Sequence, residues 1–174
     1  MKPIIPLFSA LALTALTSCQ TSQSKPAASM AMPPYQGSAA FEQMKTLAGK
    51  WKGQTCVGLM TTEFRVIAGG SVIEERFAEG TPMEMLSTYH DVNGQLVMTH
   101  YCALRNQPRM RLVKRTANAL TFDFTSTPGL NPAKDQHMHG ATYTFVDANH
   151  VKVEGVSWKN GKPEPGCACE YTRL

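Results

Sequence analysis

The sequence predicts an all-β domain built as an antiparallel sandwich or barrel. Three observations favour this class: short runs of β-prone residues recur along the chain, turn-forming residues separate them, and no helix longer than a few turns is evident. The lack of long helices argues against an architecture of alternating strands and helices. With 174 residues, the chain is long enough for one domain with a hydrophobic core.

The chain begins with the features of a bacterial lipoprotein signal peptide. Lys2 precedes an apolar run, residues 4–15, that has about the length of a secretory h-region and is too short to span a bilayer. Leu16-Thr17-Ser18-Cys19 is typical of a lipobox, in which small residues before the cysteine suit cleavage on its N-terminal side. We therefore expect residues 1–18 to be removed and Cys19 to carry the lipid.

The lipid on Cys19 is expected to anchor the protein, because no later segment is long and apolar enough for a transmembrane helix. Gln20, rather than an aspartate, follows the cysteine. In the familiar enterobacterial sorting rule this predicts the outer membrane of the cell envelope, with the domain facing the periplasm. Residues 19–38 contain three prolines and almost no bulky apolar side chains, which indicates a flexible tether before a barrel domain at 39–174.

One short helix is expected at residues 39–47, where Phe41, Met44 and Leu47 repeat at helical spacing and Gly49 follows. Ten β-prone runs come after it, separated by turn signals such as Gly69-Gly70 and Asn160-Gly161. The expected strands are residues 51–58, 62–68, 71–78, 83–92, 95–103, 109–115, 120–125, 140–147, 151–158 and 168–173.

Asn93-Gly94 is the strongest hairpin signal, since both residues tolerate the positive φ of a type I′ turn. A two-residue loop fixes the register, so Tyr89 is expected opposite Met98 and Ser87 opposite His100. Because side chains alternate across a strand, one face of this hairpin is predicted to collect several chemically interesting residues. These are Met85, Ser87, Tyr89, Leu96, Met98, His100 and Cys102.

The segment from Phe41 to Gly53, which includes Gly49-Lys50-Trp51, resembles the opening of lipocalin-like β-barrels, including the nitrobindin-like group. The resemblance implies an antiparallel up-and-down barrel of about eight to ten strands with a short N-terminal plug helix. In such barrels an arginine of the last strand packs on the tryptophan of the first. Trp51 and Arg173 are therefore expected to have a structural role.

Three later motifs, Thr99-His-Tyr-Cys102, Asn106-Gln-Pro-Arg109 and Trp158, resemble an uncharacterised family of small, secreted, lipocalin-like bacterial proteins. The resemblance covers roughly residues 41–174. It does not extend to heme, because none of four histidines can be matched to the heme ligand of nitrobindin-like barrels. The histidines compared are His90, His137, His139 and His150.

The fold analogy implies a cavity that binds a small, largely apolar ligand. Candidate lining residues come from the predicted hairpin and the strand that follows it. Arg109 is expected to pair with an acidic head group of the ligand. The candidate ligand-binding residues are Tyr89, Met98, His100, Cys102 and Arg109.

Two alternatives remain open at this point. The first is a soft-metal site for a copper(I)- or zinc-like ion, formed by His100, Cys102, His137 and His139, because residues two apart on a strand share a face and can both reach one ion. No other cofactor is expected. The second is a structural envelope protein whose core is completely filled.

Four cysteines follow Cys19, and in an oxidising compartment an even number indicates disulfides. Cys167 and Cys169 are too far apart along an extended strand to pair with each other. Barrel closure would place the first strand beside the last. We therefore expect a bridge from Cys56 to either Cys167 or Cys169.

Composition and motifs exclude some functions. The formal net charge of +4 is small and scattered, which argues against a nucleic-acid partner. The chain lacks a Gly-x-Ser-x-Gly elbow, a His-Glu-x-x-His motif, a phosphate-binding glycine loop and a dinucleotide fingerprint, so no catalytic residue is assigned and an enzyme is not the favoured interpretation. The expected partners are a membrane, through the acyl chains, and a small apolar molecule; no protein partner is specified.

Overall fold

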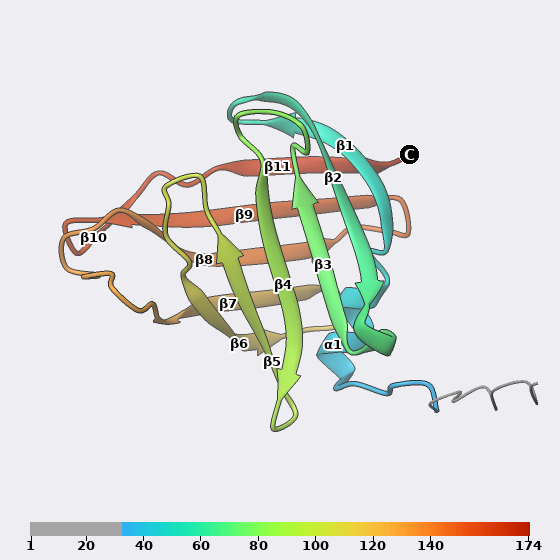
Figure 1. Cartoon of the computed structure of the whole chain (residues 1–174). Helices are drawn as coiled ribbons and strands as arrows, with labels where there is room; N and C mark the ends of the chain where they lie inside the picture. The colour runs from blue at the N-terminus through green and yellow to red at the C-terminus, as the bar shows by residue number, and fades with distance from the viewer. Residues whose placement is uncertain (1–32) are drawn as a thin grey trace, which may run out of the picture. The chain divides into compact units, whose positions relative to one another are not determined.

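The computed structural model describes residues 33–174; the expected signal peptide, Cys19 and most of the tether lie outside the described residues. Within residues 33–174 the chain forms one α-helix, one short 3-10 turn and eleven strands (Figure 1). No helix in this range is long and apolar enough to cross a bilayer. The elements are α1 (Ala39–Lys45), β1 (Gly49–Thr55), β2 (Gly58–Ile67), η1 (Ala68–Gly70), β3 (Val72–Phe77), β4 (Met85–Val92), β5 (Gln95–Tyr101), β6 (Arg109–Arg115), β7 (Ala119–Ser126), β8 (His137–Phe145), β9 (His150–Lys159), β10 (Lys162–Glu164) and β11 (Ala168–Arg173).

The sheet closes into a barrel of ten antiparallel strands. Each strand from β1 to β9 pairs with the next, β9 pairs with β11, and β11 pairs with β1. At the junction Trp51 lies opposite Arg173, so the first and last strands are hydrogen-bonded as expected. The short β10 pairs only with β9 and stands outside the ring. The prediction of an all-β, antiparallel, up-and-down barrel with a short preceding helix is confirmed.

The β4–β5 hairpin has the register that its two-residue loop predicts. Tyr89 pairs with Met98, and Ser87 pairs with His100. Asn93 and Gly94 adopt φ values of 52° and 78°, as a type I′ turn requires. The predicted face of the hairpin therefore points into the barrel.

Helix α1 packs against one end of the barrel, called here the α1 end. The side chain of Ser38 caps the helix by accepting a hydrogen bond from the backbone N–H of Phe41, and Asp91 on β4 holds Ser38 in place. Phe41 and Met44 are fully buried. They join a core that fills this half of the barrel and includes Trp51, Phe64, Ile73, Leu96, Leu120 and Val151.

Trp51 and Arg173 lock the α1 end. The guanidinium of Arg173 lies 4.1 Å from the centre of the Trp51 ring, and the indole N–H donates to the carbonyl of Leu47 at 2.7 Å. Arg173 also donates to the carbonyls of Thr46 and Ala48 at 2.8 and 2.7 Å. The Arg173 side chain of the last strand thus satisfies two backbone carbonyls just after α1. Carbonyls at the C-terminus of a helix have no intrahelical partner.

The strand boundaries differ from the expectation mainly at β1, β2 and β8. Strand β1 ends at Thr55, three residues before the expected end at residue 58, and β2 begins at Gly58, four residues before the expected start at residue 62. Strand β8 begins at His137, three residues before the expected start at Gly140, and its pairing with β9 is irregular between Met138 and Gly140. Histidines carry no strong strand signal, which is why the sequence pattern placed the start at Gly140. The short β10 was also not expected.

Candidate functional site

A cavity of about 410 Å³ lies at the end of the barrel opposite α1. Its walls come from the ends of β1, β3 and β5, the starts of β4, β8 and β11, and the second half of β9. Most of its lining is apolar. Val57, Leu104 and Val156 are 43–47% exposed, so this pocket opens to solvent along them. The other apolar lining side chains are Phe77, Met83, Met85, Met138, Val153 and Pro165.

Strand register places three polar side chains in a row on one wall of the pocket. Glu75 on β3 pairs with Ser87 on β4, which in turn pairs with His100 on β5. All three side chains are buried and point inward. Neighbouring residues across antiparallel strands have Cβ atoms about 5 Å apart, so the row is continuous across the three strands.

Glu75 is a fully buried carboxyl surrounded by hydroxyl groups. Tyr143 donates a hydrogen bond to its Oε2 at 3.1 Å, Tyr89 donates to the same oxygen, and Thr62 lies 3.4 Å from Oε1. The hydroxyls of Tyr89 and Tyr143 are themselves 2.6 Å apart. Burial raises the pKa of Glu75, and the hydrogen bonds that it accepts offset part of that effect. Desolvation is the larger of these two effects on the pKa of Glu75.

His100 presents a neutral imidazole to the pocket. Its Nδ1 lies 3.0 Å from the hydroxyl of Ser87, and the residue is only 7% exposed. Burial lowers the pKa of His100 from 6.5 to about 4. Within residues 33–174, Nε2 has no hydrogen-bond partner. In the polar row that Glu75, Ser87 and His100 form, Nε2 of His100 is therefore an end without a hydrogen bond.

The buried His100 predicts a loss of stability in acid. Between pH 6.5 and 4 the unfolded chain binds a proton at this residue and the folded chain does not, so the free energy of unfolding falls as the pH falls. The loss should reach about 3 kcal/mol near pH 4. Urea unfolding at pH 7 and pH 4.5 should show a smaller loss for His100→Phe than for the unmodified chain. Equal losses in the two chains would contradict the prediction; Glu75, whose raised pKa acts in the opposite direction, is present in both.

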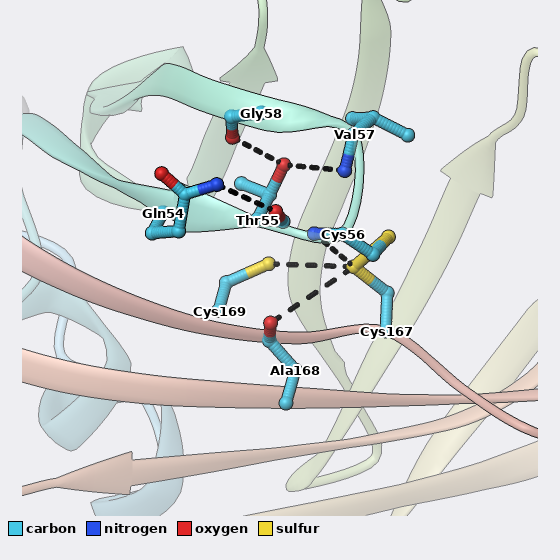
Figure 2. Close-up of a disulfide and its surroundings, with 8 residues drawn as sticks. All are labelled: Gln54, Thr55, Cys56, Val57, Gly58, Cys167, Ala168 and Cys169. Carbon is cyan, nitrogen blue, oxygen red and sulfur yellow. Dashed lines mark hydrogen bonds between the residues drawn. A yellow bond between two sulfur atoms is a disulfide. The ribbon is translucent and has the colours of Figure 1, made fainter.

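A disulfide joins Cys56 to Cys167 at the rim of the pocket (Figure 2). It ties the β1–β2 turn to the residue that precedes β11, so it adds a covalent link beside the closing β1–β11 pair. Of the two expected partners for Cys56, the structure thus selects Cys167. Cys169 lies next to the bridge, with its Sγ 3.8 Å from that of Cys167.

Cys102 and Cys169 are free thiols that also line the pocket. Burial raises the pKa of both. Because the thiolate is the nucleophile and the metal ligand, both groups are held in their less reactive form. Figure 2 shows the Cys169 side chain directed toward Cys167.

The other three predicted ligand residues lie elsewhere. Tyr89 and Met98 are fully buried in the barrel interior and are not among the lining residues. Arg109 is exposed on the outer face, where it pairs with Thr99. The inward position of β6 belongs to Met110, opposite Met98. Arg109 therefore does not reach the pocket, and the expected partner for an acidic head group is absent from it.

The three histidines and one cysteine of the metal alternative do not form one cluster. Among residues 33–174, no three His, Cys, Asp or Glu side chains converge as a metal site. His137 and His139 instead hydrogen-bond to each other at 3.0 Å. His139 is stacked between Phe124 and Trp158, with ring centres 5.2 and 3.9 Å away. These contacts account for both histidines without an ion.

Glu75 is the main site residue that the sequence analysis missed. The signal was present, because Ile73, Glu75 and Phe77 alternate as the inward positions of β3. In the sequence Glu75 is flanked by Glu74 and Arg76, and such a run of charged residues is typical of a strand exposed to solvent. Only the strand register shows which of these side chains points inward.

Comparison with known proteins shows no family. No protein-family model and no curated protein matches the sequence. Among solved structures, a redesigned β-barrel is similar, with 11% sequence identity, a TM-score of 0.35, and coverage of 75% of this chain and 93% of that chain. The assignment of the fold as a closed barrel therefore rests on the strand pairing observed in this chain.

Proposed function

We propose that this protein is a lipid-anchored envelope protein whose barrel binds one small, largely apolar molecule. The observation that carries the proposal is the pocket of about 410 Å³, which lies within the range of small-molecule sites. Its walls are mostly apolar, with a few polar groups that converge on one side. Core side chains fill the α1 end and the contact between Trp51 and Arg173 closes it, so a ligand enters at the opposite end.

The proposed anchoring rests on the lipobox that ends at Cys19 and on the apolar run before it. Gln20 supports the outer membrane, with the barrel facing the periplasm. The disulfide between Cys56 and Cys167 is consistent with an oxidising compartment. Growth of a bacterial host with radioactive palmitate should label the unmodified protein and leave the Cys19→Ala variant unlabelled. An unmodified protein without label would remove the anchor from the proposal.

The polar row favours binding over catalysis. The distance of 3.0 Å between Ser87 and His100 suits a nucleophile and its base. However, the lowered pKa of His100 makes it a weak base at neutral pH, and no third group among residues 33–174 orients its Nε2. The row is therefore better suited to hold a ligand than to activate Ser87.

Binding can be tested with the neutral fluorophore N-phenyl-naphthylamine. The mature chain, residues 19–174 with Cys19→Ala, is suitable, because it has neither the apolar signal segment nor an acyl chain to compete for the pocket. Gly155 lines the pocket, and a Cβ there would meet its neighbours at ordinary contact distances of 3.7 Å and more. Gly155→Leu should therefore fill the pocket and weaken binding by about tenfold or more.

Glu154→Leu is the matched control, since it introduces the same side chain at the adjacent, partly exposed position of β9. It should leave fluorophore binding unchanged. If the unmodified pocket does not bind the fluorophore, or if Gly155→Leu binds as well as Glu154→Leu, the proposed function is wrong.

A further inference from the structure

The polar row ends in a single atom that is available to a ligand. Ser87 hydrogen-bonds to Nδ1 of His100 at 3.0 Å and lies opposite Glu75 in the strand register. The oxygens of Glu75 are already occupied by hydroxyl groups of the protein. Nε2 of His100 has no partner within residues 33–174 and belongs to a side chain that lines the pocket. A polar group of the ligand would meet this atom first.

The hydrogen bonds of the row can run in either direction. If Nδ1 of His100 donates to Ser87, Nε2 is an acceptor. If Ser87 donates to Nδ1, Nε2 carries the hydrogen and is a donor. A serine hydroxyl both donates and accepts, so neither direction leaves Ser87 unsatisfied. A ligand group that both donates and accepts fits either state, whereas a group that only accepts fits only the state in which Nε2 carries the hydrogen.

The charge of the wall excludes an ionised head group. Among the described residues that line the pocket there is no lysine or arginine, and the one carboxyl belongs to Glu75. A carboxylate, phosphate or sulfate on the ligand would be buried without a counter-charge, which costs several kcal/mol. An ammonium group could pair only with Glu75, whose two oxygens already accept hydrogen bonds from hydroxyl groups of the protein.

We propose that the pocket selects an apolar molecule with one uncharged hydroxyl group, which hydrogen-bonds to Nε2 of His100. This inference rests on the proposed function and specifies the class of ligand. The hydroxyl both donates and accepts, as the row requires, and the apolar remainder lies against Phe77, Met85 and Met138. The expected ligand is thus an alcohol and not the acidic amphiphile that Arg109 would have bound.

Three ligands of similar size test the proposal by displacement of N-phenyl-naphthylamine from the mature chain, residues 19–174 with Cys19→Ala, at pH 7.5. Decanol donates and accepts, nonyl methyl ether only accepts, and decanoate is charged. Decanol should displace the fluorophore at a concentration about threefold or more lower than the ether, because the ether can hydrogen-bond to Nε2 only when the row runs in one direction. Decanoate should require at least about tenfold more than decanol.

His100→Phe keeps a planar ring and removes both nitrogens. It should reduce the preference for decanol over the ether to less than about twofold while changing ether binding little. His90→Phe is the matched control, because His90 lies on β4 outside the pocket lining and should leave the preference intact.

The outcomes separate this inference from the proposed function. If the fluorophore binds and all three ligands displace it equally, or if the preference for decanol survives in His100→Phe, the hydroxyl proposal is wrong and apolar binding stands. If the fluorophore does not bind, both fail. The comparison of the three ligands in the chain with an intact His100 needs no folded pocket variant, so it tests the hydroxyl proposal even if the His100→Phe protein misfolds.

Discussion

Replacing Trp51 with alanine is expected to lower the free energy of unfolding by about 3–5 kcal/mol. The indole is 1% exposed and fills the α1 end together with Phe41 and Met44. Its removal leaves a large cavity, and it also deletes the hydrogen bond to the carbonyl of Leu47 and the stacked partner of Arg173. Equilibrium unfolding in urea, followed by circular dichroism, measures the change.

Arg173→Lys is the informative companion variant. A lysine keeps the charge but cannot donate to the carbonyls of Thr46 and Ala48 at once while it lies flat on the indole. We expect an intermediate loss, about 1–2 kcal/mol. A Trp51→Ala protein with unchanged stability would show that this end of the barrel is not packed as described.

Removing the disulfide should have an effect of similar size. The bridge between Cys56 and Cys167 spans 111 residues, and restricting so long a loop in the unfolded chain stabilises the fold by about 4 kcal/mol. The double variant Cys56→Ser with Cys167→Ser should therefore unfold at a markedly lower urea concentration. Replacing both cysteines prevents Cys169 from pairing with the one that remains.

Cys102→Ser serves as the control, because Cys102 is a half-buried thiol with no disulfide. Its effect should be about 1 kcal/mol or less. A reducing agent should reproduce the loss in the unmodified chain and leave the double variant unaffected. If the reductant destabilises both proteins equally, the bridge is not the source of the stability.

The barrel itself could be predicted because its signals are local. The contact of Trp51 with Arg173 was expected only from the resemblance to lipocalin-like barrels. The turn signals are local, and Asn93-Gly94 sets the register of β4 and β5. These features depend on a few residues whose conformational preferences are strong. The inward position of His100 followed from the same register.

The site could be predicted only in part, because it depends on register far from any clear turn. Ten residues separate the start of β4 from Glu75, and no two-residue loop fixes β3 against β4. The position of Arg109 depends on the long connection between β5 and β6, which gave no indication of which face β6 would turn inward. The choice between Cys167 and Cys169 required the position of the β1–β2 turn in space. Such details emerge from packing and not from local pattern.

Closure by the β1–β11 pair has a consequence for how the chain folds during synthesis. Trp51 and Arg173 are 122 positions apart, so β1 and β9 each keep an unpaired edge until the last strand leaves the ribosome. Nascent chains that stall before β11 would expose two open edges able to pair with other extended chains. Loss of the last few residues should therefore cause aggregation rather than a slightly shorter barrel.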